Sequence, residues 1–239
     1  MNEDKIYSDE KLGDEPFRFD SAVARVFPDM LRRSIPGYEA SLEAIGSLAG
    51  RYARANTSCC YDLGCSLGAA SLAMRQGIRA PGCRVIAVDN APAMVDRARE
   101  LVAGQAGIDV LLADIRNVEI RNASMVVMNY TLQFLDPTAR DEMIHRIFAG
   151  LNPGGLFLLS EKVIDEDPDM EALLVDLHHE HKRRNEYSQL EISRKRAALE
   201  NVLIPETVAV HKQRLADAGF AHSAVWLRYF NFVSIVAIK

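Results

Sequence analysis

The chain contains little cysteine and no cysteine pattern that would bind a metal. Its 239 residues include four cysteines, and none of them forms a CxxC pair: Cys59, Cys60, Cys65 and Cys83. Structural zinc sites are usually built from such pairs, so we expect no metal site. We expect these thiols to be reduced, small and buried, with Cys65 able to reach a ligand through its backbone.

Long hydrophobic runs and a basic charge are also missing. No apolar run approaches the length that spans a bilayer, and the acidic first residues lack the basic-then-apolar order of a secretion signal. We therefore expect a cytoplasmic protein with no membrane partner. The formal net charge is −5, whereas a protein that grips a long nucleic acid usually carries a basic face. The composition, 49% hydrophobic and 26% charged, is typical of a soluble globular protein.

Short apolar runs alternate with helical patterns along the middle of the chain. Strands are predicted over residues 57–64, 83–90, 108–114, 124–134 and 156–162, with helical patterns between them. This alternation indicates a parallel sheet covered by helices on both faces. The last two runs, 222–230 and 232–239, have a very short connection and predict an antiparallel strand pair.

Two helical additions frame this core. Residues 20–54 precede the first strand, and residues 168–203 separate the fifth strand from the last helix. The second addition is too long for a simple connection, so it is a candidate for a lid or a dimer element. The polar residues 1–18 are expected to be flexible. We take residues 1–239 as a single domain, since this length supports one full hydrophobic core.

Ligands of open α/β sheets bind beyond the carboxyl ends of the strands, and the first strand ends in Gly64-Cys65-Ser66-Leu67-Gly68. A dinucleotide fingerprint has a glycine at the position of Ser66, where backbone must approach a pyrophosphate. The Cβ of Ser66 therefore argues against an NAD-dependent oxidoreductase but not against a ligand without phosphates. A plain strand–helix turn is the alternative.

Polar residues follow the next three strands as well. Asp89, with Asn90, is placed to accept the hydroxyls of a ribose, although Asn90 is also a good helix N-cap. Asp114 could accept an adenine amino group beside the Ile115 backbone, or it is a turn aspartate. Asn129 ends an apolar run near the expected reactive end of the ligand, or it is a satisfied turn asparagine. Together these positions describe a pocket for a nucleoside without phosphate.

This order is the layout of the S-adenosylmethionine-dependent methyltransferase fold, which the sequence resembles over residues 57–239. The resemblance includes the "LNPGG" turn, the "LADAGF" helix end and the closing strand pair. The predicted fold is therefore α/β and Rossmann-like, of the class I methyltransferase type. It has a mostly parallel seven-stranded sheet with an antiparallel C-terminal strand.

Longer segments narrow the resemblance. They are "VFPDMLRRSIPGY", "YDLGCSLGAAS", "VIAVDNAPAM", "NASMVVMNYTLQFL", "LNPGG", "LSEK" and "SQLEISRKRAALENVL". From about residue 19 to the C-terminus the sequence resembles the carboxy-S-adenosyl-L-methionine synthases, a family of bacterial tRNA-modification enzymes. The serine of "GCSLG" belongs to that pattern.

The resemblance implies carboxyl transfer rather than methyl transfer. That family converts S-adenosylmethionine and prephenate to carboxy-S-adenosylmethionine and phenylpyruvate. A partner, a tRNA carboxymethyltransferase, then uses the product at the wobble uridine of tRNA. In the chemistry proposed for the family, prephenate releases carbon dioxide and hydroxide, and a sulfonium ylide captures the carbon dioxide. No general base stands out in the sequence, and the released hydroxide can take the proton.

The resemblance also assigns two residues. Arg196, in "EISRKR", would meet the carboxylate of the product, for which a planar guanidinium is suited. Tyr38, in "IPGY", would contact the ligand. Judged by spacing alone, Arg196 is a solvated helix charge and Tyr38 a packing aromatic. Ser66 would shape the methionine end of the pocket for a carboxylated product. The family further implies a homodimer without direct, stable tRNA binding.

Other functions stay open. An ordinary methyltransferase acting on a small acidic acceptor would have the same fold, and a non-catalytic tRNA-binding protein is opposed by the acidic net charge. In "HHEHKRRNE", His178 and His181 lack a third ligand at metal-binding spacing. The cations at 182–184 form either a solvated face or the mouth of a pocket that attracts dianionic prephenate.

Overall fold

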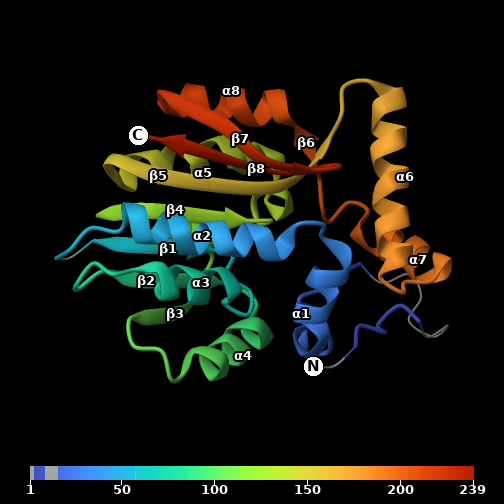
Figure 1. Ribbon diagram of the computed structural model, residues 1–239, viewed down its shortest axis with the longest axis horizontal. Helices are drawn as coiled ribbons and strands as arrows, with labels where there is room; N and C mark the ends of the chain where they lie inside the picture. The colour runs from blue at the N-terminus through green and yellow to red at the C-terminus, as the bar shows by residue number, and fades with distance from the viewer. Residues whose placement is uncertain (1–2, 9–15, 57) are drawn as a thin grey trace.

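The structure, a computed structural model, describes residues 3–8, 16–56 and 58–239 and contains one mixed sheet (Figure 1). Its strands are β1 (Cys59–Leu63), β2 (Arg84–Asp89), β3 (Ile108–Leu112), β4 (Ala123–Asn129), β5 (Leu151–Ile164), β6 (Glu206–Thr207), β7 (His222–Tyr229) and β8 (Phe232–Ile238). The main path runs in the order β3-β2-β1-β4-β5-β8-β7, and β6 pairs with β5 off this path.

The pairing confirms the predicted sheet. Strands β1 to β5 pair in parallel, whereas β8 is antiparallel to both of its neighbours, β5 and β7. Two details differ from the prediction. The two-residue strand β6 is too short to show a hydrophobic period. Strand β5 begins at Leu151 rather than at residue 156, because the "LNPGG" segment is already part of the strand.

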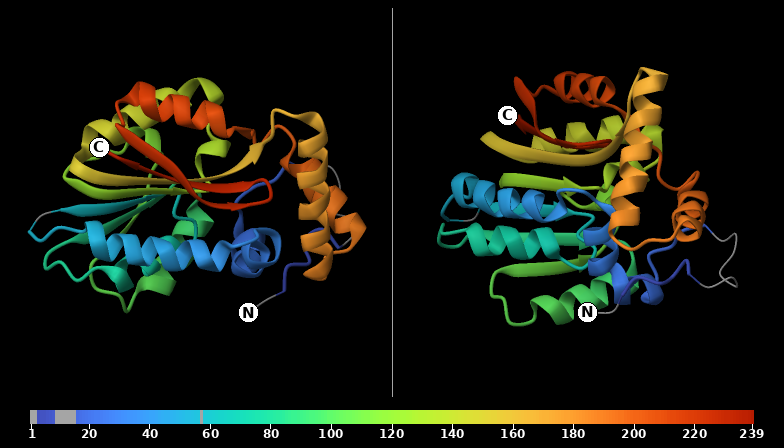
Figure 2. Two further views of the ribbon diagram at one scale, coloured as in Figure 1. Left: turned by 45° about the horizontal axis from the view of Figure 1, so that its top comes forward. Right: turned by 45° about the vertical axis from the view of Figure 1, so that its right-hand side comes forward.

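Helices form the outer layers on both sides of the sheet (Figure 2). The helices of the described residues are α1 (Ser21–Ser34), α2 (Tyr38–Tyr52), α3 (Ala69–Gly77), α4 (Pro92–Val102), α5 (Pro137–Gly150), α6 (Pro168–Arg184), α7 (Gln189–Leu199) and α8 (Val208–Ala218), with short 3-10 helices η1 (Ile115–Asn117) and η2 (Leu132–Phe134). Apolar side chains of α2 and α3 share one core cluster with the sheet, and those of α5 and α8 share another. No helix in the described ranges is long and apolar enough to cross a membrane.

Helices α2 and α3 approach each other closely through glycines. A Cβ on Gly77 would overlap the carbonyl oxygen of Gly46, and a Cβ on Gly46 would lie 2.8 Å from the Ala73 carbonyl oxygen. Backbone contact of this kind leaves no room for side chains. It fixes α3, and with it the turn between β1 and α3 that faces the ligand side.

The end of α1 holds α6 and α7 together beside the strand ends (Figures 1 and 2). The Ser34 carbonyl oxygen bonds the His178 ring at 2.9 Å, and the Ser34 hydroxyl accepts from Lys195 Nζ at 3.1 Å. Arg33 Nε donates to the Asn185 carbonyl oxygen at 2.7 Å. The additions expected over 20–54 and 168–203 thus contain helices that pack against one another rather than independent appendages.

The first described residues also pack against this group. Asp4 is 1% exposed and accepts the Tyr187 hydroxyl at 2.5 Å. The Asp4 amide donates to Asp29 of α1, and its carboxylate lies 3.8 Å from Lys195 of α7. We expected flexibility over residues 1–18; within that stretch residues 1–2 and 9–15 lie outside the described residues, and Asp4 links α1 to α7.

Candidate active site

A cavity of about 820 Å³ lies at the carboxyl ends of the strands. This is where open α/β sheets bind ligands, and small-molecule sites typically measure about 300–1,000 Å³. All the site residues predicted from the sequence line this cavity: Tyr38, Gly64, Cys65, Ser66, Asp89, Asn90, Asp114, Ile115, Asn129 and Arg196. The structure therefore brings the predicted site residues together around one cavity.

Asp89 at the end of β2 organises the turn that follows β1. Its Oδ2 accepts the Ser66 amide at 2.8 Å and its Oδ1 accepts the Ala91 amide at 2.9 Å. Each carboxylate oxygen keeps a second lone pair, so both can still accept a ribose hydroxyl. Burial raises the pKa of Asp89, while the hydrogen bonds from backbone amides oppose that shift.

Gly64 and Cys65 are fixed by the neighbouring strands. Gly64 has φ +81°, and a Cβ there would overlap the Thr131 side chain, so this position requires glycine. The Cys65 amide donates to the Val88 carbonyl oxygen at 2.9 Å. It is therefore engaged in the fold, which limits the backbone contact with a ligand that we expected from Cys65.

Ser66 adopts φ +48°, a left-handed conformation that glycine adopts without strain. The Ser66 amide donates to Asp89, the carboxylate that we expect to hold the ribose. Ser66 also lines the cavity, as a role at the methionine end requires.

In Ser66→Gly we expect the backbone conformation to be retained. Affinity for the carboxylated product should fall about two- to tenfold more than affinity for S-adenosylmethionine, because the variant loses about one neutral hydrogen bond. Calorimetric titration with both ligands tests this, and an equal loss for the two would contradict it.

Two of the alternative roles can be decided. Asn90 is exposed and is not the N-cap of α4, because Ala91 occupies that position. Asp114 does act as a turn aspartate: it caps η1 and accepts the Arg116 guanidinium at 2.5 Å, and this bond lowers the pKa of Asp114. Asp114 still lines the cavity beside Ile115. An adenine amino group would share the carboxylate with Arg116.

Two polar side chains that line the cavity, Asn129 and Tyr38, have polar atoms that form no hydrogen bond with a described residue. Asn129 Oδ1 is buried and has no hydrogen-bond partner among the described residues, so the alternative of a satisfied turn asparagine is wrong. The Tyr38 side chain also lines the cavity, and burial, with nearby Asp62, raises its pKa. Both are available for a ligand, since buried polar groups normally have partners.

Sequence analysis missed Asp62 at the end of β1. It is 1% exposed, lines the cavity and accepts the Ser71 hydroxyl at 2.5 Å. Burial raises its pKa to about 6. The signal was the acid within the apolar strand "CCYDL", immediately before the glycine turn. A carboxylate there can face an ammonium group of a ligand.

The opposite wall is cationic and comes from β5, α6 and α7. Lys162, Lys182 and Lys195 line the cavity together with Arg196, which is exposed at the cavity's edge. Burial, Lys195 and Lys162 lower the pKa of Lys182 to about 7, and burial lowers that of Lys195 to about 8. The three cations at 182–184 therefore do not share one environment. Lys182 is buried at the cavity, whereas Arg183 and Arg184 are exposed.

Neither His178 nor His181 is arranged as a metal ligand. The His178 ring bonds the Ser34 carbonyl oxygen at 2.9 Å, and burial lowers its pKa to about 2. His181 Nε2 contacts the Asn185 amide at 3.0 Å. Within the described ranges, no three His, Cys, Asp or Glu residues gather as a metal site would need.

Comparison with known sequences decides the family. A family model for a methyltransferase domain matches residues 61–155. Carboxy-S-adenosyl-L-methionine synthase of Trichlorobacter lovleyi is 56% identical over 227 residues, 93% of both chains, and that of Aliivibrio fischeri is 54% identical over 100% of this chain and 99% of its own. The chain belongs to the carboxy-S-adenosyl-L-methionine synthase family. The resemblance noted in the sequence is thereby confirmed.

Solved structures confirm the fold of this synthase family member. A putative S-adenosyl-L-methionine-dependent methyltransferase from Methanococcus maripaludis superposes with a TM-score of 0.61 at 19% identity, covering 94% of this chain and 95% of its own. An O-methyltransferase family protein from Burkholderia thailandensis has a TM-score of 0.67, also at 19% identity, over 92% of this chain and 60% of its own. These similarities show the methyltransferase fold. Because one fold can carry many functions, the function has to be inferred from the residues of the site.

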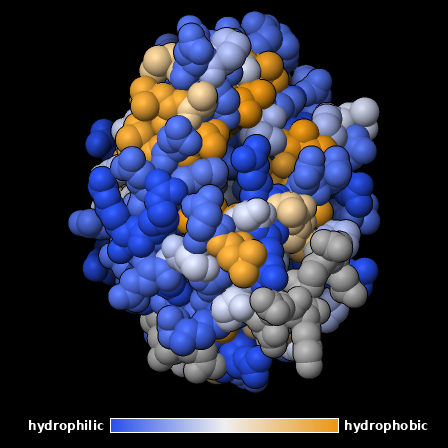
Figure 3. Space-filling view, turned by 90° about the vertical axis from the view of Figure 1, so that its right-hand side faces the viewer, coloured by the Kyte–Doolittle hydropathy of each residue, from blue (hydrophilic) through white to orange (hydrophobic). Residues whose placement is uncertain are grey.

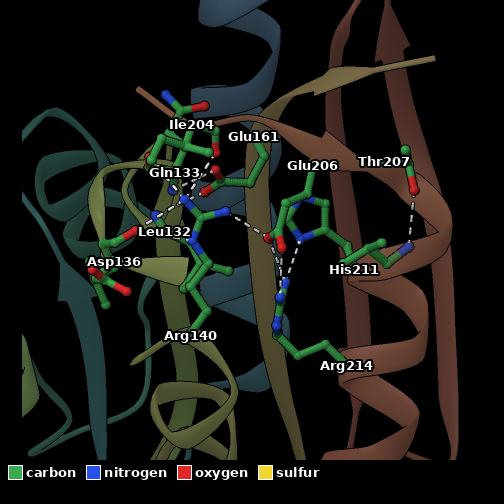
Figure 4. A network of polar contacts seen from close by, with 12 residues as sticks. Leu132, Gln133, Asp136, Arg140, Glu161, Ile204, Glu206, Thr207, His211 and Arg214 are labelled. Atoms are coloured by element: carbon green, nitrogen blue, oxygen red, sulfur yellow. Dashed lines mark hydrogen bonds and ion pairs between the residues drawn. The ribbon is translucent and has the colours of Figure 1, made fainter. Parts of the chain in front are cut away.

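A polar network around Arg140 joins η2 to β5 and β6 in this synthase family member (Figure 4). Arg140 is fully buried, pairs with Glu206 at 2.7 Å and donates to the Gln133 carbonyl oxygen at 3.2 Å. Gln133 lines the cavity, and its Oε1 accepts the Lys162 amide at 2.9 Å. The Glu161 carboxylate accepts the Gln133 amide at 2.8 Å. The network thus positions η2 and the backbone of Lys162, one of the cationic residues that line the cavity.

Proposed function

We propose that the protein is a carboxy-S-adenosyl-L-methionine synthase that uses prephenate as its second substrate. The observation that carries this proposal is the pairing of two walls in one cavity. Strand ends suited to a nucleoside without phosphate face lysines and an arginine suited to carboxylates. An ordinary methyltransferase needs the first wall but has no need of the second unless its acceptor is acidic.

The nucleoside side of the cavity follows from the geometry of the strand ends. Asp89 would accept the ribose hydroxyls with its remaining lone pairs, and Asp114 with Ile115 would bound the adenine. Asp62 and the orphaned oxygen of Asn129 would face the cationic methionine end of S-adenosylmethionine. A sulfonium nucleoside needs no cradle for phosphates, which fits a serine at position 66.

The reaction balances without a cofactor. Prephenate breaks the bond to its ring carboxylate and releases carbon dioxide, and its ring becomes aromatic as hydroxide leaves, giving phenylpyruvate. The hydroxide takes a proton from the sulfonium methyl group and becomes water. The resulting carbon nucleophile forms a bond to carbon dioxide, which yields the carboxymethyl sulfonium.

The protein's contribution is to hold both reactants together and to exclude water. Residues of α6 and α7 line the cavity, and contacts with the end of α1 hold both helices in place there. Enclosure matters because free carbon dioxide and hydroxide would otherwise escape before capture. Arg196 would pair with the carboxylate of the product, with a geometry suited to its guanidinium.

The decisive experiment is mass spectrometry of small molecules from the purified, denatured protein, before and after incubation with S-adenosylmethionine and prephenate. We expect a nucleoside heavier than S-adenosylmethionine by one carbon dioxide to accumulate, together with phenylpyruvate. Detection of only S-adenosylmethionine or its demethylated product after prephenate is added would instead favour a methyltransferase for a small acidic acceptor.

The proposed setting is a cytoplasmic homodimer that supplies a tRNA carboxymethyltransferase acting on wobble uridine. Figure 3, which faces the α6 side, shows hydrophobic areas among hydrophilic ones. Met170 and Leu173 of α6 and Leu190 of α7 are large and exposed hydrophobic side chains. These exposed hydrophobic side chains on α6 and α7 support a dimer contact in which a second copy of the chain covers them. The net charge of −5 supports release of the product rather than stable tRNA binding.

A further inference from the structure

The side chain of Lys182 is largely buried beside the cavity, and no acidic side chain in the described ranges lies within ion-pair distance of it. It is 8% exposed, and its side chain forms no hydrogen bond or ion pair with any residue in the described ranges. Burying an isolated charge is costly, so buried cations in stable proteins are normally paired. Since Lys182 lines the cavity, the missing partner has room to be a ligand.

The neighbouring lysine shows what a structural role looks like. Lys195 is 6% exposed and lines the same cavity, but it donates to the Ser34 hydroxyl at 3.1 Å and lies 3.8 Å from the Asp4 carboxylate. Lys195 therefore links α7 to α1 and to the N-terminal segment. Lys195 thus has Asp4 within ion-pair distance, whereas the same carboxylate acts on Lys182 only from beyond that distance.

Lys162 of β5 joins Lys182 at the cavity. Its side-chain ammonium likewise forms no hydrogen bond or ion pair with a described residue. Burial lowers the pKa of both lysines, and repulsion from Arg196 adds to the shift at Lys162, whereas repulsion from Lys195 and Lys162 adds to the shift at Lys182. Burial and repulsion from Lys182 and Lys162 lower the pKa of His178, so the imidazole adds no further positive charge beside them. The carboxylate of Glu171 also lines the cavity and attracts Lys162.

We infer that Lys182, assisted by Lys162, forms a subsite for a carboxylate of the second substrate, distinct from Arg196, which is reserved for the carboxylate of the product. The inference rests on the proposed function and adds residues to it. A dicarboxylate would bring one negative charge to Lys182 and Lys162 and leave the other towards the exposed Arg196. The wall thereby selects dianions over neutral or singly charged acceptors.

The test is calorimetric titration of prephenate into protein saturated with S-adenosylhomocysteine, which lacks the methyl group and allows no turnover. We expect Lys182→Met to weaken prephenate binding by about tenfold or more, the size of one charge-assisted hydrogen bond. Lys182→Arg should restore most of the affinity. Arg184→Met, which removes an exposed charge from the same helix, serves as the matched control and should bind as the wild type does.

Thermal unfolding separates this role from a structural one. Lys182→Met removes a largely buried amine that has no ion-pair partner within the described ranges, so the melting temperature of the free protein should rise or stay constant while prephenate affinity falls. A fall in melting temperature with unchanged prephenate affinity would overturn the subsite.

A second probe separates the subsite from the proposed function. Phenylmalonate, an aromatic dianion, is titrated in the same way. If it binds through Lys182 and prephenate does not bind at all, the subsite stands and the proposed substrate fails. If neither dianion binds the wild type, or if both bind Lys182→Met and wild type equally, the subsite is wrong.

Discussion

Replacing Asp89 by alanine is expected to weaken the binding of S-adenosylmethionine by about 100-fold or more. Bound S-adenosylmethionine would lose two hydrogen bonds between its ribose hydroxyls and the Asp89 carboxylate, each worth about 1.5–3 kcal/mol because one partner is charged. The substitution would also release the Ser66 and Ala91 amides that the carboxylate now holds at 2.8 and 2.9 Å. The turn after β1 and the start of α4 would then lose their common anchor.

Calorimetric titration of S-adenosylmethionine into Asp89→Ala measures this effect. Asp96→Ala provides the control, because Asp96 is an exposed carboxylate on α4 whose side chain is 75% accessible. We expect the control to bind as the wild type does. An Asp89 variant that retains affinity within a few-fold would show that the carboxylate serves only the turn, and the nucleoside would then have to lie elsewhere in the cavity.

The strand ends could be predicted from the sequence because their signals are local. An apolar run of strand length ending in Gly64, Asp89 or Asn129 identifies both the strand and the residue at its carboxyl end. Parallel pairing then brings those ends to one edge of the sheet without further information. This is why all the predicted site residues line one cavity.

The cationic wall could not be predicted in the same way. Lys182 lies in a run of cations, "HKRR", which is typical of a solvated helix face. Its burial depends on α1 packing against α6, and the Ser34–His178 contact joins residues that are 144 positions apart. Nothing in the local pattern of α6 contains that information. The family resemblance supplied Arg196 because it compares motifs, but it named no lysine.

Asn129 and Asp114 show a further limit. Their sequence positions allowed both a ligand role and a local role. The structure separates them by their partners, since Arg116 occupies the Asp114 carboxylate whereas Asn129 Oδ1 has no partner in the described part of the chain. Hydrogen-bond satisfaction depends on the tertiary neighbours of a group, so spacing alone could not decide between these roles.

Replacing Arg140 by methionine is expected to lower the free energy of unfolding by about 3–5 kcal/mol, as when one partner of a buried ion pair is removed. Arg140 is fully buried, pairs with Glu206 at 2.7 Å and donates to the carbonyl oxygens of Leu135 and Ile204 at 3.0 and 2.9 Å. Methionine fills similar space but leaves these carbonyl oxygens without a donor. Urea unfolding followed by circular dichroism measures the difference.

The same substitution should reach the cavity because Arg140 holds the Gln133 carbonyl oxygen, and Gln133 in turn accepts the Lys162 amide. We therefore expect weaker prephenate binding along with the loss of stability. Arg97→Met is the control, since Arg97 pairs with Glu100 on the surface, where such pairs contribute at most about 1 kcal/mol. If Arg140→Met were no less stable than this control, the Glu206 carboxylate would have to be satisfied by Arg214 alone, which already donates to both of its oxygens at 2.8 and 2.9 Å. The network would then be redundant, and η2 would owe its position to the bonds from the Leu132 and Gln133 amides to Glu161.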